Sequence, residues 1–363
     1  MRISYLVSKI FYYLCQQFDF KRMSKRTEIS ELGHFGLIDH LTSGVECNHE
    51  SSVVGIGDDA AVIDAGDKYL LLSTELLLEG VHFDLTYFPL KHLGYKAVVA
   101  GMSDIIAMNG TPRQLTVSIG VSARFAVEHL EELYEGIKAA CKEYSIDLVG
   151  GDTTASVNGL ALSVSAVGEV AKDKLVRRSG AKVNDLVCIT SDLGAAYMGL
   201  HLLERERIAL DGHPNPNPDF KGHEYILRRW LKPDLRLDII KALEAEGIVP
   251  SAMIDITDGL ASDALQICKA SGCGVRLYLE RVPIAAETRA MAEELNADPI
   301  VAMLNGGDDY ELLFTVPLEM RDKVLHFGGV DVIGHITEWG AVLVTPEGGE
   351  LPLTAPGFAK KEQ

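Results

Sequence analysis

GIGDDAAVI (residues 55–63) places two glycines and two aspartates between apolar segments. Residues 53–57 (VVGIG) and 69–74 (YLLLST) are rich in aliphatic and β-branched side chains, which predicts strands on either side of a turn. A dinucleotide-binding glycine loop opens a helix, but residues 61–74 have the pattern of turn and strand, which argues against a Rossmann loop. The tripeptide Gly-Asp-Asp occurs at 57–59 and again at 307–309, which is a weak similarity between the two halves of the chain.

Outward from this segment, strand and helix patterns alternate. The clearest helix is 126–144, where apolar residues recur every three or four positions. Helices are also predicted at 90–109, 223–231, 234–246 and 259–271 and from Gly194, and strands at 114–121, 146–149, 160–167, 186–190, 252–256, 274–279, 310–316, 329–336 and 341–345. The segment 211–222 holds three prolines and is predicted to be a loop.

A polar, turn-rich segment at 172–185 separates two such alternating sets, and 363 residues suit about two domains of roughly 150 residues. The predicted fold class is α/β (α+β) with two domains. We expect an N-terminal extension at 1–26, an N-terminal domain at 27–172 and a C-terminal domain at 173–363. Residues 1–22 are basic and aromatic but lack a signal-peptide cleavage site, which favours an upstream extension or an alternative start at Met23 over a membrane anchor.

Composition excludes several classes of protein. With 52 acidic and 34 basic residues the net charge is −18, which would repel nucleic acid. Apolar stretches are too short and broken for a transmembrane helix, so no membrane partner is expected. Six cysteines without a C-x-x-C pair indicate reduced thiols and a cytoplasmic protein.

The acidic residues gather beside glycines, at what we predict to be strand ends. The segments are 55–63, 73–83 (STELLLEGVHF), 102–112 (MSDIIAMNGTP), 148–156 (LVGGDTTAS), 254–263 (IDITDGLASD) and 304–314 (LNGGDDYELLF). A single Gly-Asp pair is more simply a turn. Several pairs brought to one cleft would repel one another unless cations lay between them, and hard oxygen ligands point to Mg²⁺.

Other motifs carry less information. No P-loop pattern occurs, and no Ser, Cys and His arrangement resembles a nucleophilic triad. His82 alone reads as a structural histidine. Arg177 and Arg178 could be ordinary solvated charges, or could stabilise phosphoryl oxygens beside an ATP site.

Seven strings, in order, resemble the thiamine-monophosphate kinase family, within the superfamily of aminoimidazole ribonucleotide synthetase and selenophosphate synthetase. They are GIGDDAAV, EGVHF, SDIIAMNGTP, GGDTT, RSGAK, DITDGL and GGDDYELLFT, and the resemblance runs from about Ser30 to Phe358. It implies two α/β domains, a homodimer joined through the N-terminal sheets, and ATP with several Mg²⁺ ions in a cleft.

The resemblance also implies site residues. The metal-binding positions are Asp59, Ser73, Thr74, Glu75, Asp104, Asp152, Asp255 and Asp258. The ATP positions are Gly151, Asp152, Arg178 and Thr257, and the thiamine-phosphate positions are His82, Asp308 and Phe358. Three of these depart from the usual pattern of the family: Glu75 stands for aspartate, Thr257 for serine and Asp308 for glutamate. Each keeps its chemistry but changes reach or bulk by roughly one bond, about 1.5 Å.

The implied reaction is ATP-dependent phosphorylation of thiamine monophosphate to thiamine diphosphate. The acceptor phosphate is largely dianionic at neutral pH, so it is already a nucleophile and no general base is expected. Direct in-line transfer without a phosphoenzyme follows. The alternatives are another ATP-dependent synthetase or kinase of the superfamily, or a non-catalytic sensor of Mg²⁺-nucleotide.

Overall fold

The computed structural model describes residues 27–213, 217–326 and 328–355. The extension predicted at 1–26 and the predicted substrate residue Phe358 lie outside the described residues. The chain divides into two compact units, residues 1–45 with 356–363 and residues 46–355. The described part of the first unit is helix α2 (Ile29–Thr42), which kinks at Gly33, where φ is 69°.

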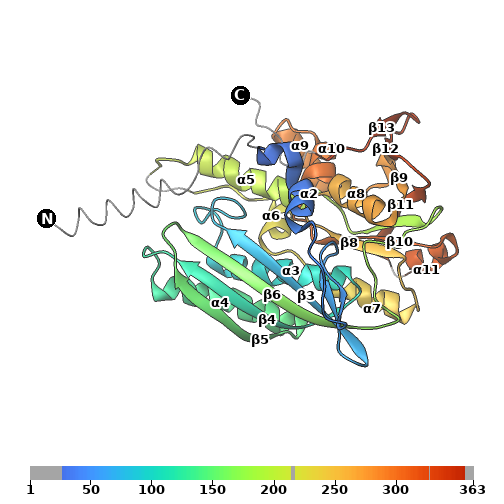
Figure 1. Cartoon of the computed structure of the whole chain (residues 1–363). Coiled ribbons are helices and arrows are strands. Elements are labelled where there is room, and N and C mark those ends of the chain that lie inside the picture. The colour runs from blue at the N-terminus through green and yellow to red at the C-terminus, as the bar shows by residue number, and fades with distance from the viewer. Residues whose placement is uncertain (1–26, 214–216, 327, 356–363) are drawn as a thin grey trace. The chain divides into compact units, whose positions relative to one another are not determined.

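Residues 46–355 contain two sheets (Figure 1). The first has six strands in the order β1-β2-β3-β6-β4-β5, in which β4 and β5 are parallel and the other neighbours antiparallel. Its strands are β1 (Ser52–Val54), β2 (Ala61–Asp64), β3 (Lys68–Leu78), β4 (Thr111–Val121), β5 (Asp147–Ala155) and β6 (Leu160–Ala171). Every second residue of β6 from Leu160 to Val170 is buried, so one face of this sheet is covered.

Helices α3 (Leu90–Ala107) and α4 (Val127–Tyr144) provide that cover. The two helices pack closely because each has a glycine where they meet. A Cβ atom on Gly94 would lie 2.0 Å from the carbonyl oxygen of Leu133, and one on Gly136 would lie 1.8 Å from that of Lys91. Only glycine fits at such a distance. Helix α3 is buried on nearly all sides because it also contacts β8 of the second sheet.

The second sheet has seven strands in the order β13-β12-β9-β11-β7-β10-β8. They are β7 (Leu186–Thr190), β8 (Ala252–Ile256), β9 (Gly274–Tyr278), β10 (Glu311–Val316), β11 (Val330–Thr337), β12 (Ala341–Val344) and β13 (Glu350–Pro352). The associated helices are α5 (Ala195–Ala209), α6 (Glu224–Leu231), α7 (Leu237–Ala245), α8 (Leu260–Ser271), α9 (Ala286–Glu294), α10 (Pro299–Asn305) and α11 (Arg321–His326), with 3-10 turns η2 (Leu279–Arg281) and η3 (Leu318–Met320). Its central strands are buried on both faces, and the face that carries Met253 and Phe314 belongs to the same core as α3.

Most predicted elements are present, and the α/β prediction with two sheets is confirmed. The strand predicted at 146–149 was too short: β5 continues through GGDTTA because β4 pairs with it in parallel as far as Ala155. Residues 61–74 form strands rather than a helix, which confirms that the glycine loop is not a Rossmann loop. The proposed domain boundary stays a prediction. Residues 172–185 do lie between the strands of the two sheets, but 46–355 pack as one unit.

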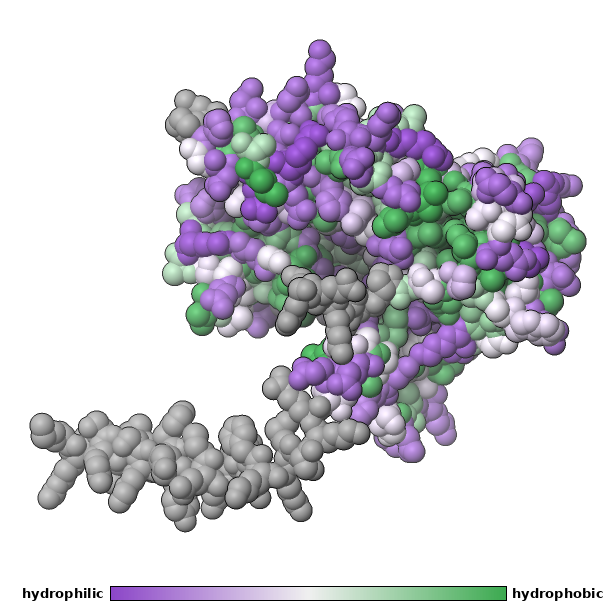
Figure 2. Space-filling view, turned by 90° about the horizontal axis from the view of Figure 1, so that it is seen from above, coloured by the Kyte–Doolittle hydropathy of each residue, from purple (hydrophilic) through white to green (hydrophobic). Residues whose placement is uncertain are grey.

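In the space-filling view hydrophilic side chains cover most of the visible face, with smaller hydrophobic areas between them (Figure 2). Among the described residues, none of the helices combines the length and the hydropathy needed to cross a bilayer.

Candidate active site

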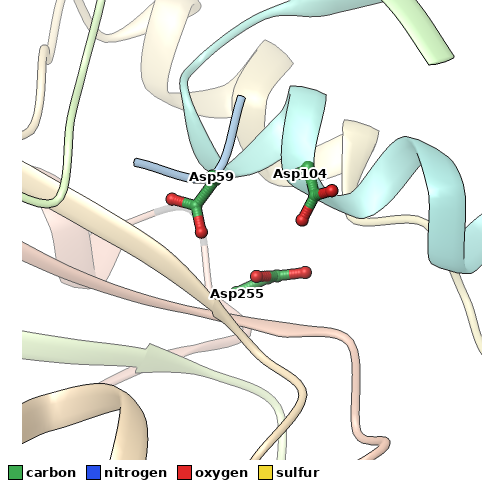
Figure 3. Close-up of side chains that lie close together, drawn as sticks. All are labelled: Asp59, Asp104 and Asp255. Carbon is green, nitrogen blue, oxygen red and sulfur yellow. The ribbon is translucent and has the colours of Figure 1, made fainter. Parts of the chain in front are cut away.

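Three aspartates from distant parts of the sequence meet where the two sheets adjoin. Asp59, Asp104 and Asp255 each offer a carboxylate oxygen, and these oxygens all lie within 4.8 Å of one another. Figure 3 shows the three carboxylates pointing toward a common centre. Asp59 and Asp255 are buried, and each has one carboxylate oxygen that is buried without a hydrogen-bond partner. Orphaned carboxylate oxygens converging in this way fit a hard divalent cation such as Mg²⁺.

Strand alternation places Asp255 in this cluster. In β8, Ile254 and Ile256 pack into the core on the α8 side of the sheet, whereas Met253 packs into the core that contains α3. Side chains alternate along a strand, so Asp255 shares the face of Met253 and points toward α3. It accepts a hydrogen bond there from the side chain of Ser103.

The same helix and its neighbouring strand supply further polar groups. Asp104 lies within α3, and Ser73 of β3 donates a hydrogen bond to the carbonyl oxygen of Gly101, 3.2 Å away. Alternation along β3 puts Ser73 and Glu75 on the face toward α3 and Thr74 on the opposite, exposed face. The site therefore draws on one helix and on both sheets.

Two adjacent arginines hold the GDD segment in place. The Nε and Nη2 atoms of Arg178 donate to Asp59 Oδ1 at 2.9 and 2.6 Å, a forked contact. Arg177 Nε donates to Asp58 Oδ2 at 2.8 Å, and the backbone N–H of Arg178 donates to Asp58 Oδ1 at 3.0 Å. Both residues follow β6 in sequence, so these bonds close the loop after β1 onto the segment that joins the two sheets.

Burial and mutual repulsion perturb the carboxylates. Burial raises the pKa of Asp59 to about 7, against the lowering effect of Arg178. Burial and the charge of Asp255 raise the pKa of Glu75 to about 7. Burial raises the pKa of Asp104 well above its ordinary value, and the charges of Asp255 and Asp59 add to this. Because these buried carboxylates repel one another, a cation bound between them would stabilise their charged forms.

Two loops from the second sheet complete the surroundings. The residues after β8 and before β10 lie together because these strands pair in antiparallel fashion. The backbone N–H of Asp308 donates to the carbonyl oxygen of Thr257 at 3.0 Å. A Cβ atom on Gly307 would lie 2.4 Å from that carbonyl oxygen, so only glycine allows the loops to approach so closely. Asp308 and Tyr310 both have positive φ, 57° and 54°, a strained conformation for residues other than glycine.

The prediction that the aspartates mark strand ends was right in some places and wrong in others. Asp59 follows β1, and the other GDD segment precedes β10. Asp104, however, lies inside a helix, and Asp152 and Asp255 lie inside strands. The fold brings Asp104 and Asp255 to the site through helix and strand faces, which the Gly-Asp pattern could not indicate.

Comparisons with known proteins show which family the chain belongs to. Residues 57–170 match the family model "AIR synthase related protein, N-terminal domain", and residues 202–344 match "AIR synthase related protein, C-terminal domain". A thiamine-monophosphate kinase of Aquifex aeolicus is 34% identical over 317 residues, covering 87% of this chain and 95% of the relative. The chain belongs to the thiamine-monophosphate kinase family. A second member, from Bacillus subtilis, is 32% identical over 332 residues, covering 91% of this chain and 92% of the relative.

A solved structure of the thiamine-monophosphate kinase family, described as AaThiL complexed with AMPPCP and TMP, has the same fold. Its TM-score is 0.78 at 32% identity, and the match covers 90% of this chain and 97% of that one. The fold described above is therefore the family's fold over most of the chain.

Not every residue expected from the family pattern joins the carboxylate cluster. Gly151 and Asp152 lie on the exposed edge strand β5. The registers align Asp152 with Ser118 of β4, Ser163 of β6 and Leu76 of β3. Three strand spacings, roughly 14 Å, therefore separate Asp152 from the β3 segment that contains Glu75. Within one chain Asp152 is thus set apart from this β3 segment, and it is not a member of the cluster formed by Asp59, Asp104 and Asp255.

Three further expected residues lie in loops that follow strands β8 and β3. Asp258 and Thr257 are exposed in the loop after β8. The pKa of Glu75 is raised first by burial, then by the charges of Asp255 and Asp308, and last by that of Asp258. His82 lies beyond the end of β3, where its Nδ1 accepts a hydrogen bond from the backbone N–H of Leu78 at 3.0 Å. This contact leaves Nε2 of His82 to carry the proton in the neutral ring.

Sequence reasoning did not single out several buried charged residues, and two of them are Asp263 and Lys96. Asp263 of α8 is 2% exposed, and one of its carboxylate oxygens has no partner. Its signal was its position in the first turn of the helix that follows Asp258, in the segment IDITDGLASD. Lys96 of α3 is 3% exposed and pairs with Asp308. Its signal was a lone lysine in the apolar run GYKAVVAGM.

The raised carboxyl pKa values predict how the metal-free protein responds to pH. The folded state holds protons that the unfolded chain releases near pH 4, so folding stability should fall, by a few kcal/mol, as pH rises from about 4 to about 7. Excess Mg²⁺ should reverse the trend, because cations bind the deprotonated carboxylates. Chemical denaturation with EDTA and with Mg²⁺ at several pH values measures both curves. If the gap between them does not widen toward pH 7, the carboxylates are not a metal site.

Proposed function

We propose that this protein phosphorylates thiamine monophosphate to thiamine diphosphate, with ATP as the phosphoryl donor and Mg²⁺ as the metal. The observation that carries the proposal is the convergence of Asp59, Asp104 and Asp255 beside Arg178, in a chain that matches the AMPPCP and TMP complex over 90% of its length. The chemistry fits, because phosphoryl transfer between two polyanions needs positioning and charge compensation rather than a general base.

In this proposal the converging aspartates hold the metal. Glu75, Asp258 and Ser73 extend the oxygen-ligand set, and Thr74 can contribute through its backbone. Bound Mg²⁺ would neutralise phosphate charge and stabilise the charge that develops on the transferred group. Arg178 keeps Asp59 oriented and, with Thr257, offers donors to the nucleotide phosphates. Gly151 and Asp152 on β5 would hold a more distant part of the nucleotide.

The acceptor side is proposed to lie toward the loops that carry Asp308 and His82. The acceptor phosphate is largely dianionic at neutral pH and needs no residue to remove a proton. Transfer is then direct and in line, and no phosphoenzyme forms.

We also propose a homodimer joined through the six-stranded sheet. The face of β3 that points away from α3 carries three exposed leucines, Leu72 at 41%, Leu76 at 52% and Leu78 at 36%. A row of leucines on an open sheet face is the kind of surface that a second copy covers. Sedimentation equilibrium of the full chain should give twice the monomer mass, and a monomer at micromolar concentration would contradict this.

A cytoplasmic location is part of the proposal. Its support is that the described cysteines, at positions 47, 141, 188, 268 and 273, are free thiols, as in reducing compartments.

The deciding experiment is an assay of purified protein with ATP, Mg²⁺ and thiamine monophosphate. We expect stoichiometric thiamine diphosphate and ADP, and no product when thiamine replaces its phosphate. Turnover of thiamine itself would assign another kinase activity. Tight nucleotide binding without turnover of either acceptor would instead indicate a sensor of Mg²⁺-nucleotide.

His82 provides a test of the acceptor side. His82→Ala should raise the KM for thiamine monophosphate by roughly tenfold, the cost of one lost hydrogen bond to a charged group, and leave the KM for ATP nearly unchanged. Steady-state kinetics with each substrate varied in turn measures the two effects, and His129→Ala, an exposed histidine of α4, is the control. An equal rise in the KM values for both substrates would contradict a role of His82 at the acceptor.

A further inference from the structure

Lys96 is a charged residue in the interior of the protein. It lies on α3, and its side chain is only 3% exposed. Its Nζ atom is 3.4 Å from the ring centroid of Trp230 on α6, and 5.8 and 5.9 Å from those of Phe88 and Tyr310. Aromatic faces stabilise a desolvated ammonium group, so these rings form an aromatic cage around the charge.

One carboxylate completes the surroundings of this ammonium group. Lys96 Nζ donates to Asp308 Oδ2 at 3.1 Å, while the hydroxyl group of Tyr310 donates to Asp308 Oδ1 at 3.1 Å. Both oxygens of Asp308 are thus anchored, although its side chain remains 32% exposed. The partly exposed carboxylate of Asp308 is therefore held in place by the buried ammonium group of Lys96.

The charge of this pair matters because the region is acidic. Asp308 contributes to the raised pKa of Glu75, after burial and Asp255. A second unpaired carboxylate here would add to the repulsion of any incoming phosphate. The ion pair with Lys96 offsets that charge, and it also ties the strained backbone of Asp308 to helix α3.

We propose that Lys96 is a positioning residue for the acceptor: it orients Asp308 and compensates its charge, so that a substrate carrying a phosphate monoester can bind beside it. This role rests on the proposed function and adds to it a residue that touches no substrate. Lys96 acts through Asp308, so substituting Lys96 should weaken acceptor binding. The same substitution should have no further effect once the carboxylate of Asp308 has been removed.

A double-mutant cycle tests this role. Lys96→Met retains most of the side chain inside the aromatic cage but removes the charge. We expect it to raise the KM for thiamine monophosphate by roughly 10–100-fold, and the KM for ATP by less than about threefold. In an Asp308→Asn background the same change should have little further effect, because the partner charge is already gone.

Other outcomes have distinct meanings. Equal loss for both substrates, additive effects in the two backgrounds, or an unchanged acceptor KM in Lys96→Met would each overturn the positioning role. If Lys96→Met does not fold, Lys96→Arg replaces it in both backgrounds, with a smaller but still acceptor-specific loss expected because the charge is kept.

The wild-type chain separates this inference from the proposed function. If the wild-type protein phosphorylates thiamine monophosphate but the effects of Lys96→Met and Asp308→Asn on the acceptor KM are additive, only the positioning role of Lys96 is rejected. A wild-type chain that neither binds thiamine monophosphate in a calorimetric titration nor phosphorylates it would reject both.

Discussion

Asp255→Asn should lower kcat/KM for phosphoryl transfer by about 10³-fold or more while the protein remains folded. Asparagine has the same shape and can still accept the hydrogen bond from the Ser103 side chain. What it lacks is the negative charge that a hard cation requires at the centre of the cluster. Steady-state kinetics over a range of Mg²⁺ concentrations measures the loss, which saturating metal should not restore.

The same substitution should leave the metal-free protein at least as stable as wild type at pH 8. Removing a buried charge relieves its repulsion with Asp59 and Asp104, which lie within 4.8 Å. Thermal unfolding with EDTA tests this. Asp322→Asn, at a side chain that is 94% exposed on α11, is the matched control and should change neither activity nor stability. Near-normal activity of Asp255→Asn at limiting Mg²⁺ would refute the metal role.

Arg229→Met should destabilise the protein by about 3–5 kcal/mol. Arg229 is 5% exposed, and its Nη1 atom lies 2.5 Å from Oε1 of Glu311, which is 1% exposed. The other oxygen of Glu311 accepts from Arg236 at 2.9 Å and from Thr190 at 2.5 Å. Without Arg229, the buried carboxylate of Glu311 keeps only part of its charge compensation. The neighbouring Asp309 also loses a cation 3.7 Å away, and burial already raises the pKa of Asp309 to about 7.

The adjacent residue provides the control. Arg228 pairs with Asp234 on the surface, with a side chain that is 55% exposed, so Arg228→Met should cost less than about 1 kcal/mol. Urea denaturation of both variants measures the contrast. Glu311 directly follows Tyr310 and lies three residues after Asp308, and both of these have strained backbones. Arg229→Met should therefore also weaken acceptor binding. Equal stability of the two variants would show that the buried network contributes little.

Several features followed from local chemistry. The helix predicted at 126–144 is present as Val127–Tyr144, because its buried residues Leu133, Ile137 and Cys141 keep helical spacing. The helix predicted at 90–109 ends two residues earlier, at Ala107. Such elements depend on residues close in sequence, so periodicity is sufficient to predict them. The short helices α9 and α10 carry weaker patterns and were not predicted.

The candidate site was predicted in part. The family resemblance carried by the seven strings implied Asp59, Asp104 and Asp255 as metal ligands, and the fold brings these three together. The resemblance that named them also named Asp152, which the register of β5 places roughly three strand spacings from β3. Strand order depends on contacts between residues far apart in sequence, so no local pattern predicts that β6 and β4 lie between β3 and β5.

By itself the sequence determined most of the helices and strands, the residue types that could hold Mg²⁺, and the family to which the chain belongs. The tertiary structure decided which carboxylates meet, which remain on an exposed edge, and that Lys96 supplies the cation beside Asp308. The physical reason is that spacing along the chain sets the face on which a side chain lies. The partner of that face is set by packing between elements more than a hundred residues apart, as for Lys96 and Asp308.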